Sequence, residues 1–183
     1  MFCNQIAICL GKNITYDYRV IIGISQGKSF WNKLTDPGHA FVMYIDVNNN
    51  DNSIMLDASG HYGKNRTSSD VVLGNSGVTI SIPAYLSFFS SEKEYLTTFE
   101  MKLSEEETYL IKSMIENYDG QRSTWNCANA ASSLLKSSGL FENIKNHSTP
   151  KGLLKDLNNY YENHKESVIK KEYDFSTGEL INE

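Results

Sequence analysis

Hydrophobic and polar positions change their period about halfway along the chain. In the first half, short runs of β-branched and apolar residues alternate with polar clusters, which is typical of strands; these runs are residues 18–25, 39–47, 53–59, 78–82 and 95–103. Asn and Asp fill positions 48–52, so the second and third runs predict a β-hairpin. The composition of residues 60–76, rich in Gly, Ser and Asn, predicts a loop.

In the second half, apolar positions follow the spacing of helices. Ser104 and Glu107 form a capping box, which predicts that a helix begins there. The Ala- and Leu-rich run 126–138 predicts a second helix that stops at Gly139, a residue suited to the C′ position. Residues 150–164 predict a third helix.

Strands followed by helices predict the α+β class, with helices packed on an antiparallel sheet. A length of 183 residues fits one domain, because chains usually divide only beyond about 250 residues. We expect this domain to occupy residues 1–164. Residues 165–183 are charged and weakly periodic, so they predict a flexible tail.

Composition narrows the classes of function. With 17 Lys and Arg against 22 Asp and Glu, the net charge is −5, so a basic surface for nucleic acid is not expected. No apolar run approaches the roughly 18 residues of a membrane span, and the N-terminal stretch lacks the basic start and cleavage site of a signal peptide. Three cysteines, Cys3, Cys9 and Cys127, match neither a disulfide framework nor a zinc motif.

Cys127 is the first candidate for chemistry, because it stands at the start of a predicted helix built from small residues. A helix N-terminus presents unpaired backbone N–H groups and about half a positive charge, which favours a thiolate. The same N–H groups suit an oxyanion on an attacked carbonyl. The alternative is an inert core cysteine, since cysteine is among the most buried residue types.

His39 begins the first strand of the predicted hairpin and is the candidate general base. If the turn centres near residues 48–50, then Asp57, Ser59 and His61 on the return strand share the parity of His39. A side chain there would orient the imidazole, as the third member of a catalytic triad does. Hairpin arithmetic alone leaves Asp57 and His61 open for this role.

Two short motifs resemble a known family. GHAFVMY (38–44) followed by IMLDASG (54–60) resembles the His and Asn/Asp hairpin of papain-fold enzymes, and Asn126-Cys127 before an Ala-rich helix resembles circularly permuted NlpC-type amidases. In this chain His39 precedes Cys127, an order shared with lecithin:retinol acyltransferase-like proteins and several interbacterial peptidoglycan-cleaving toxins.

The resemblance covers roughly residues 20–163, and the IMLDASG segment favours Asp57 over His61 as the third member. The chain also departs from the pattern. Many permuted members carry a second His or a polar residue about a dozen positions after the first His, whereas position 51 here is an Asp within the turn cluster.

The resemblance implies a permuted papain-like fold and a cysteine hydrolase, an amidase or endopeptidase that cleaves an amide bond in bacterial peptidoglycan. In that mechanism Cys127 attacks the carbonyl, His39 takes and returns the proton, and Asp57 orients His39. The toxin members of the family further imply an antibacterial effector. We expect it to be made in the cytoplasm, to reach the periplasm of a target cell through a specialised (type VI) secretion system, and to have an immunity protein as partner.

Two other functions stay open: a lipid acyltransferase or esterase of the same fold, and a non-catalytic binding protein. The lipid function would favour an apolar anchoring segment, which the sequence does not show. A zinc site is conceivable by ligand type, but no ligand pair has the short spacing of zinc motifs; its ligands would be His39, Asp57, His61 and Cys127. We therefore expect neither a metal nor a cofactor.

Overall fold

The computed structural model describes residues 17–26, 38–47, 54–57, 75–79, 95–118, 127–174 and 179–182, and every structural statement below refers to them. Its strands form one sheet in the order β4-β3-β2-β1-β5-β6-β7, and every neighbouring pair is antiparallel. The strands are β1 (Tyr18–Gln26), β2 (His39–Asp46), β3 (Ile54–Asp57), β4 (Asn75–Thr79), β5 (Tyr95–Leu103), β6 (Val168–Asp174) and β7 (Glu179–Asn182).

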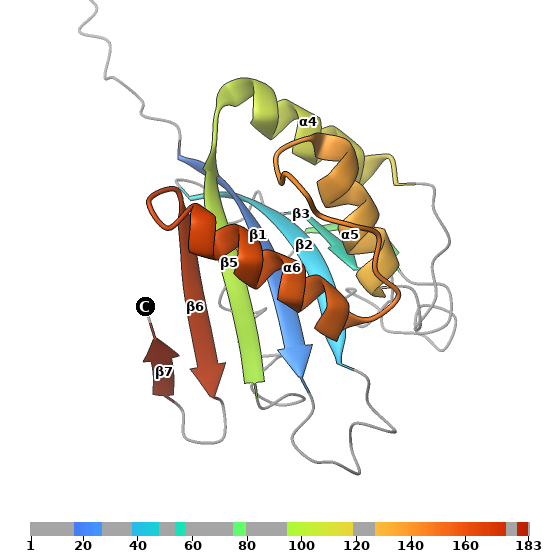
Figure 1. The fold of residues 1–183 in the computed structure, drawn as a ribbon. Helices are drawn as coiled ribbons and strands as arrows, with labels where there is room; N and C mark the ends of the chain where they lie inside the picture. The colour runs from blue at the N-terminus through green and yellow to red at the C-terminus, as the bar shows by residue number, and fades with distance from the viewer. Residues whose placement is uncertain are drawn as a thin grey trace, which may run out of the picture.

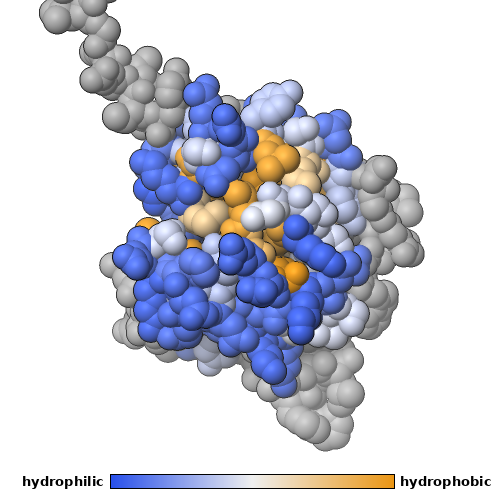
Figure 2. All heavy atoms as spheres, turned by 45° about the horizontal axis from the view of Figure 1, so that its top comes forward, coloured by the Kyte–Doolittle hydropathy of each residue, from blue (hydrophilic) through white to orange (hydrophobic). Residues whose placement is uncertain are grey.

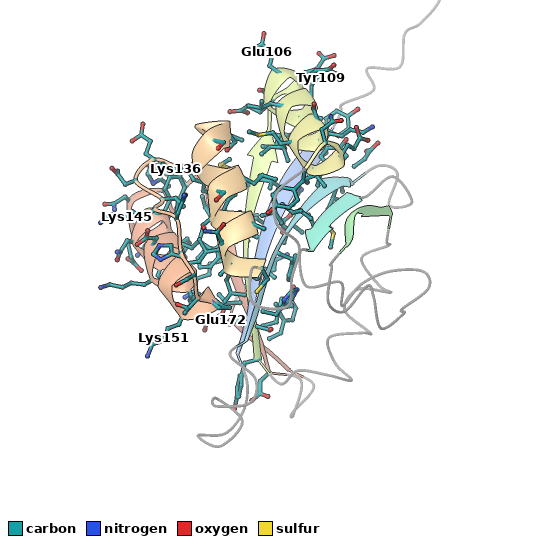
Figure 3. The ribbon with its side chains drawn as sticks, turned by 90° about the vertical axis from the view of Figure 1, so that its right-hand side faces the viewer. Glu106, Tyr109, Lys136, Lys145, Lys151 and Glu172 are labelled. Atoms are coloured by element: carbon teal, nitrogen blue, oxygen red, sulfur yellow. The ribbon has the colours of Figure 1, made fainter. Side chains whose placement is uncertain are left out.

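Three helices of the described ranges cover one face of this sheet, as Figure 1 and the side-on view of Figure 3 show. They are α4 (Glu105–Glu116), α5 (Cys127–Ser138) and α6 (Pro150–Asn163). Figure 3 shows Lys136, Lys145 and Lys151 pointing outward from this helical layer, so its outer side is charged. The arrangement confirms the predicted α+β class.

Side chains along the central strand β2 alternate between the two faces of the sheet. Ala40, Val42 and Tyr44 of β2 belong to the hydrophobic cluster between sheet and helices. The intervening residues are buried as well: Phe41 and Met43 are no more than 1% exposed. Because both faces are covered, β2 is an almost unbroken apolar run rather than a half-polar one.

The hairpin of β2 and β3 agrees with the prediction from the Asn/Asp cluster. Its register pairs Val42 with Leu56 and Tyr44 with Ile54. The predicted strand 78–82 overlaps β4, which runs from Asn75 to Thr79, and residues 80–82 lie outside the described residues. Most of the loop predicted for residues 60–76 lies outside the described residues.

The helix ends follow their predicted signals. The Ser104 Oγ accepts a hydrogen bond from the Glu107 backbone N–H, and the Glu107 carboxylate accepts one from the Ser104 N–H, which completes the capping box. Gly139 follows the last residue of α5 with φ of 71°, a left-handed conformation that glycine adopts without a Cβ clash.

The C-terminal segment differs from its prediction. Residues expected to form a flexible tail instead build β6, which pairs with β5 from Val168 to Asp174, and β7, which pairs with β6. The domain expected to end at residue 164 therefore continues into β7. The sequence of β6 is rich in charged residues and therefore lacks the apolar pattern that predicts a strand. Of its residues, only Val168, 3% exposed, belongs to the core.

Hydrophobic side chains also reach the surface. Figure 2 shows a band of them between hydrophilic regions on the face turned toward the viewer. On α4, Tyr109 is 78% exposed and Leu110 is 38% exposed. None of the helices in the described ranges combines the length and apolar character needed to cross a membrane.

Candidate active site

Cys127 is the first residue of α5, as the run of small residues predicted. Its side chain is a thiol, and the residue is 5% exposed within the cluster between sheet and helices. Ala128, Ala130 and Ala131 are at most 1% exposed, and their small size lets α5 approach the sheet closely. The first N–H groups of α5 have no partner within the helix, so the sulfur lies at the positive end of the helix dipole.

His39 is the first residue of β2 and is 2% exposed. Its ring is stacked on that of Phe41, with centroids 6.3 Å apart and planes inclined by 26°. Phe41 in turn lies over Gly23 of β1: a Cβ atom on Gly23 would fall 1.7 Å from the Phe41 Cζ. A glycine at this position therefore leaves room for the ring that packs beside His39.

The elements that carry Cys127 and His39 are neighbours. Helix α5 packs on β2 and β3, and Figure 1 shows α5 and β2 beginning at the same end of the sheet. Strand alternation assigns His39 to the face of Phe41, whereas Ala40 contributes to the cluster that contains Cys127. As the first residue of its strand, His39 stands at the end of the sheet where α5 also begins.

Of the two candidates for the third member of the triad, the structure describes Asp57 but not His61. Asp57 is the last residue of β3 and pairs with Asn75 of β4. It comes one position after Leu56, whose partner is Val42, so the ladder would bring its backbone level with Phe41 rather than with His39. His61 lies outside the described residues.

The register reveals a neighbour of His39 that sequence reasoning missed. Ser25 of β1 is the direct partner of His39 and is 0% exposed. The signal was available in part, because a single Ser at the end of the apolar run 18–25 is unusual in a central strand. Only the pairing of β1 with β2, however, could connect it to His39.

Neither Cys127 nor His39 lines either of two cavities that described residues form. One, of about 390 Å³, lies between α4 and α5 beside Met114 and Leu134. The other, of about 380 Å³, lies against α6 and includes Asp156, Tyr160 and His164. No three His, Cys, Asp or Glu side chains gather as a metal centre would require within the described part of the chain.

An acid–base pair at the second cavity has a structural role. The Asp156 carboxylate lies 2.7 Å from His147 Nε2 and accepts a hydrogen bond of 3.1 Å from the Lys145 backbone N–H. Burial alone would raise the pKa of Asp156, but the bonds from His147 and Lys145 outweigh it and hold that pKa below its usual value. The pair fastens the segment after α5 to α6.

Fold and site together define an antiparallel α+β domain in which a buried cysteine opens a helix packed beside a strand that begins with a buried histidine. No protein-family model matches the chain, and no curated protein matches it either. Among solved structures, the chain is similar to the crystal structure of the type VI secretion system effector TseH. The sequence identity is 18%, the match covers 92% of this chain and 98% of that chain, and the TM-score is 0.46.

Proposed function

We propose that this protein is a cysteine hydrolase that cleaves an amide bond in bacterial peptidoglycan, with Cys127 as nucleophile and His39 as general base. The observation that carries the proposal is that α5 and β2 begin at the same end of the sheet, α5 with Cys127 and β2 with His39. Both residues are buried among packed side chains, which would hold them in fixed positions.

The position of Cys127 supports its role as nucleophile. The N–H groups at the start of α5, which have no acceptor within the helix, would favour the thiolate and stabilise the oxyanion that forms when a carbonyl is attacked. In the first step His39 takes the proton of the Cys127 thiol, the Sγ bonds to the carbonyl carbon, and the carbon–nitrogen bond breaks as His39 passes that proton to the leaving amine. Water then hydrolyses the thioester, with His39 taking a proton from the water and returning it to the sulfur.

The position of His39 supports its role as base. It is the first residue of β2, so its ring stands at the end of the sheet, and the proposal requires that ring to reach across this end toward the start of α5. The stacked Phe41 ring would restrict its orientation. Asp57, on the adjacent strand, is proposed as the group that orients the imidazole, with His61 as the alternative.

The substrate class and the biological setting rest on the motifs that resemble permuted NlpC-type amidases. The residues themselves supply only acyl-transfer chemistry. We propose an antibacterial effector that reaches the periplasm of a target cell by a specialised secretion system and is neutralised by an immunity protein in the cell that makes it.

Digestion of purified peptidoglycan, followed by mass analysis of the released fragments, tests this function. We expect new amine and carboxyl ends at one type of peptide or amide bond with the wild-type protein and with Cys9→Ala, and none with Cys127→Ala. Fragments released equally by folded Cys127→Ala would refute the cysteine mechanism. Intact peptidoglycan in every sample, together with slow iodoacetamide labelling of Cys127, would favour the non-catalytic alternative.

A further inference from the structure

Ser25 is a buried hydroxyl residue next to His39. It lies near the end of the central strand β1, it is 0% exposed, and the β1–β2 register makes it the direct partner of His39. Residues that face each other in an antiparallel pair project from the same side of the sheet, with Cβ atoms about 4.5–5.5 Å apart. A serine hydroxyl and an imidazole nitrogen can meet across that separation.

Among the described residues, the other strand neighbours of Ser25 offer no comparable partner. On the opposite side the register pairs it with Leu96, which is 1% exposed, and two positions back along β1 is Gly23. The Ser25 Oγ has no hydrogen-bond partner among the residues that the structure describes. A buried hydroxyl is costly when it is left unsatisfied, so its presence at this position needs an explanation.

We propose that Ser25 is a positioning residue for His39: rotation of the Ser25 side chain would bring its Oγ, which accepts no hydrogen bond from the described residues, to the His39 ring as an acceptor. This inference rests on the proposed pairing of Cys127 with His39. In the neutral ring, this hydrogen bond would use the single N–H, so the other nitrogen would be the one that accepts the proton of the Cys127 thiol. When the thiol proton moves to that nitrogen, the same hydrogen bond stabilises the imidazolium.

The strand order places Ser25 and Asp57 on opposite sides of the strand that carries His39. Ser25 is on β1 and Asp57 is on β3, so they flank β2 from its two sides. The β1–β2 ladder brings Ser25 level with His39, whereas Asp57 follows the pair of Val42 and Leu56 by one position. Ser25 is therefore the direct cross-strand neighbour of the imidazole within the described ladders.

The rate of Cys127 alkylation by iodoacetamide, measured at about pH 6 and about pH 9, tests this role. A thiolate–imidazolium pair reacts at the lower pH, where an isolated thiol is largely protonated. The quantity compared is the rate at the lower pH divided by the rate at the higher pH. A change in access to the sulfur, as expected for a merely structural role, alters both rates and leaves this ratio unchanged. Full-length wild type, Ser25→Ala and Ser25→Thr are compared, with peptide mass spectrometry to locate the label.

Thr108→Ala is the matched control. Thr108 is also a buried hydroxyl residue, 8% exposed, whose Oγ1 has no hydrogen-bond partner among the described residues, but it belongs to α4. We expect Ser25→Ala to lower the rate ratio about tenfold, as the loss of a hydrogen bond to a charged group does. Ser25→Thr, which keeps the hydroxyl, and Thr108→Ala should both retain the wild-type ratio.

The outcomes separate this inference from the function on which it rests. A high wild-type ratio that falls with His39→Ala but is unchanged in folded Ser25→Ala overturns the positioning role alone. A low wild-type ratio that His39→Ala does not change overturns the Cys127–His39 pair itself. If Ser25→Ala does not fold, Ser25→Gly removes the hydroxyl without adding volume, and the same fall in the ratio is expected.

Discussion

At the scale of single residues, packing around His39 depends on the absence of one side chain. The Phe41 ring occupies the space above Gly23 and stacks on the imidazole, so two consecutive contacts link β1 to the proposed base. In proteins, catalytic groups work best when neighbours lock their rotamers. The tight fit at Gly23 therefore connects the stability of the sheet with the geometry of the site.

Gly23→Ala should disturb both properties. The added Cβ would overlap the Phe41 ring, and overpacking of this kind costs about 1–3 kcal/mol of unfolding free energy. Because Phe41 would have to move and its ring stacks on His39, we also expect slower hydrolysis of peptidoglycan. Urea unfolding and fragment release measure the two effects.

A second substitution makes this prediction specific. Phe41→Leu in the Gly23→Ala background should recover part of the lost stability, because the smaller side chain relieves the overlap. Equal losses that simply add in the double variant would show that the two positions are not coupled.

The third member of the site can be assigned with two variants. If Asp57 orients His39, then Asp57→Asn should lower the hydrolysis rate by less than Cys127→Ala does, because orienting groups contribute less than the nucleophile. His61→Ala should then have little effect. The reverse order of losses would assign the role to His61, and full activity in both variants would leave a Cys127–His39 dyad.

At the scale of elements, local signals predicted what local interactions determine. The capping box at Ser104, the stop at Gly139 and the apolar spacing of α6 each lie within a few residues, and the structure confirms all three. Strand β6 could not be found in this way, because its charged sequence becomes a strand only through the ladder with β5. Ser25 could not be identified from local sequence for the same reason, because its proposed role depends on pairing with His39, a strand partner 14 residues away.

The capping box of α4 offers a test of element stability. Ser104→Ala should lower the free energy of unfolding by about 1 kcal/mol, because the Glu107 N–H loses its acceptor. Ser113→Ala, in the last turn of the same element, serves as the control. It should cost less, because it loses only an exposed hydrogen bond of 3.3 Å from the Asn117 Nδ2 and alanine favours helices. Urea denaturation of both variants provides the measurement. Equal losses would argue against the cap.

At the scale of the whole molecule, one seven-stranded sheet joins the segment after α6 to the strands that bear the site. This continuity means that the C-terminal strands contribute to the domain rather than extending from it. It was not predictable from composition, which for residues 165–183 favours a solvated tail. The placement of Cys127 and His39 on neighbouring elements likewise depends on the order of strands.

The pKa of Asp156 predicts how the whole domain responds to acid. Its folded-state pKa is lowered, so its contribution to stability is present above the ordinary carboxyl pKa of 3.8 and is lost as the pH falls through the folded value. We expect Asp156→Asn to be less stable than the wild type at neutral pH by about 1–3 kcal/mol, as for a lost charged hydrogen bond. The difference should shrink as the carboxyl becomes protonated.

Glu162→Gln is the matched control for this effect. Glu162 pairs with Lys165 at the surface, where their side chains are 63% and 57% exposed, and such pairs contribute little. Thermal unfolding between neutral and acidic pH would show a nearly constant, small difference for Glu162→Gln. A constant difference for Asp156→Asn as well would contradict the assignment to its carboxylate.

The central claim is that Cys127 and His39 act as one catalytic unit, and a double-mutant cycle on peptidoglycan hydrolysis tests it most directly. Residues that work as a unit show strongly non-additive losses of rate. We predict that Cys127→Ala reduces hydrolysis to background, that His39→Ala loses about 10²–10⁴-fold, and that the double variant is no slower than Cys127→Ala. A His39→Ala protein with the full rate would contradict the account, and so would residual hydrolysis by Cys127→Ala that His39→Ala lowers further by its own factor.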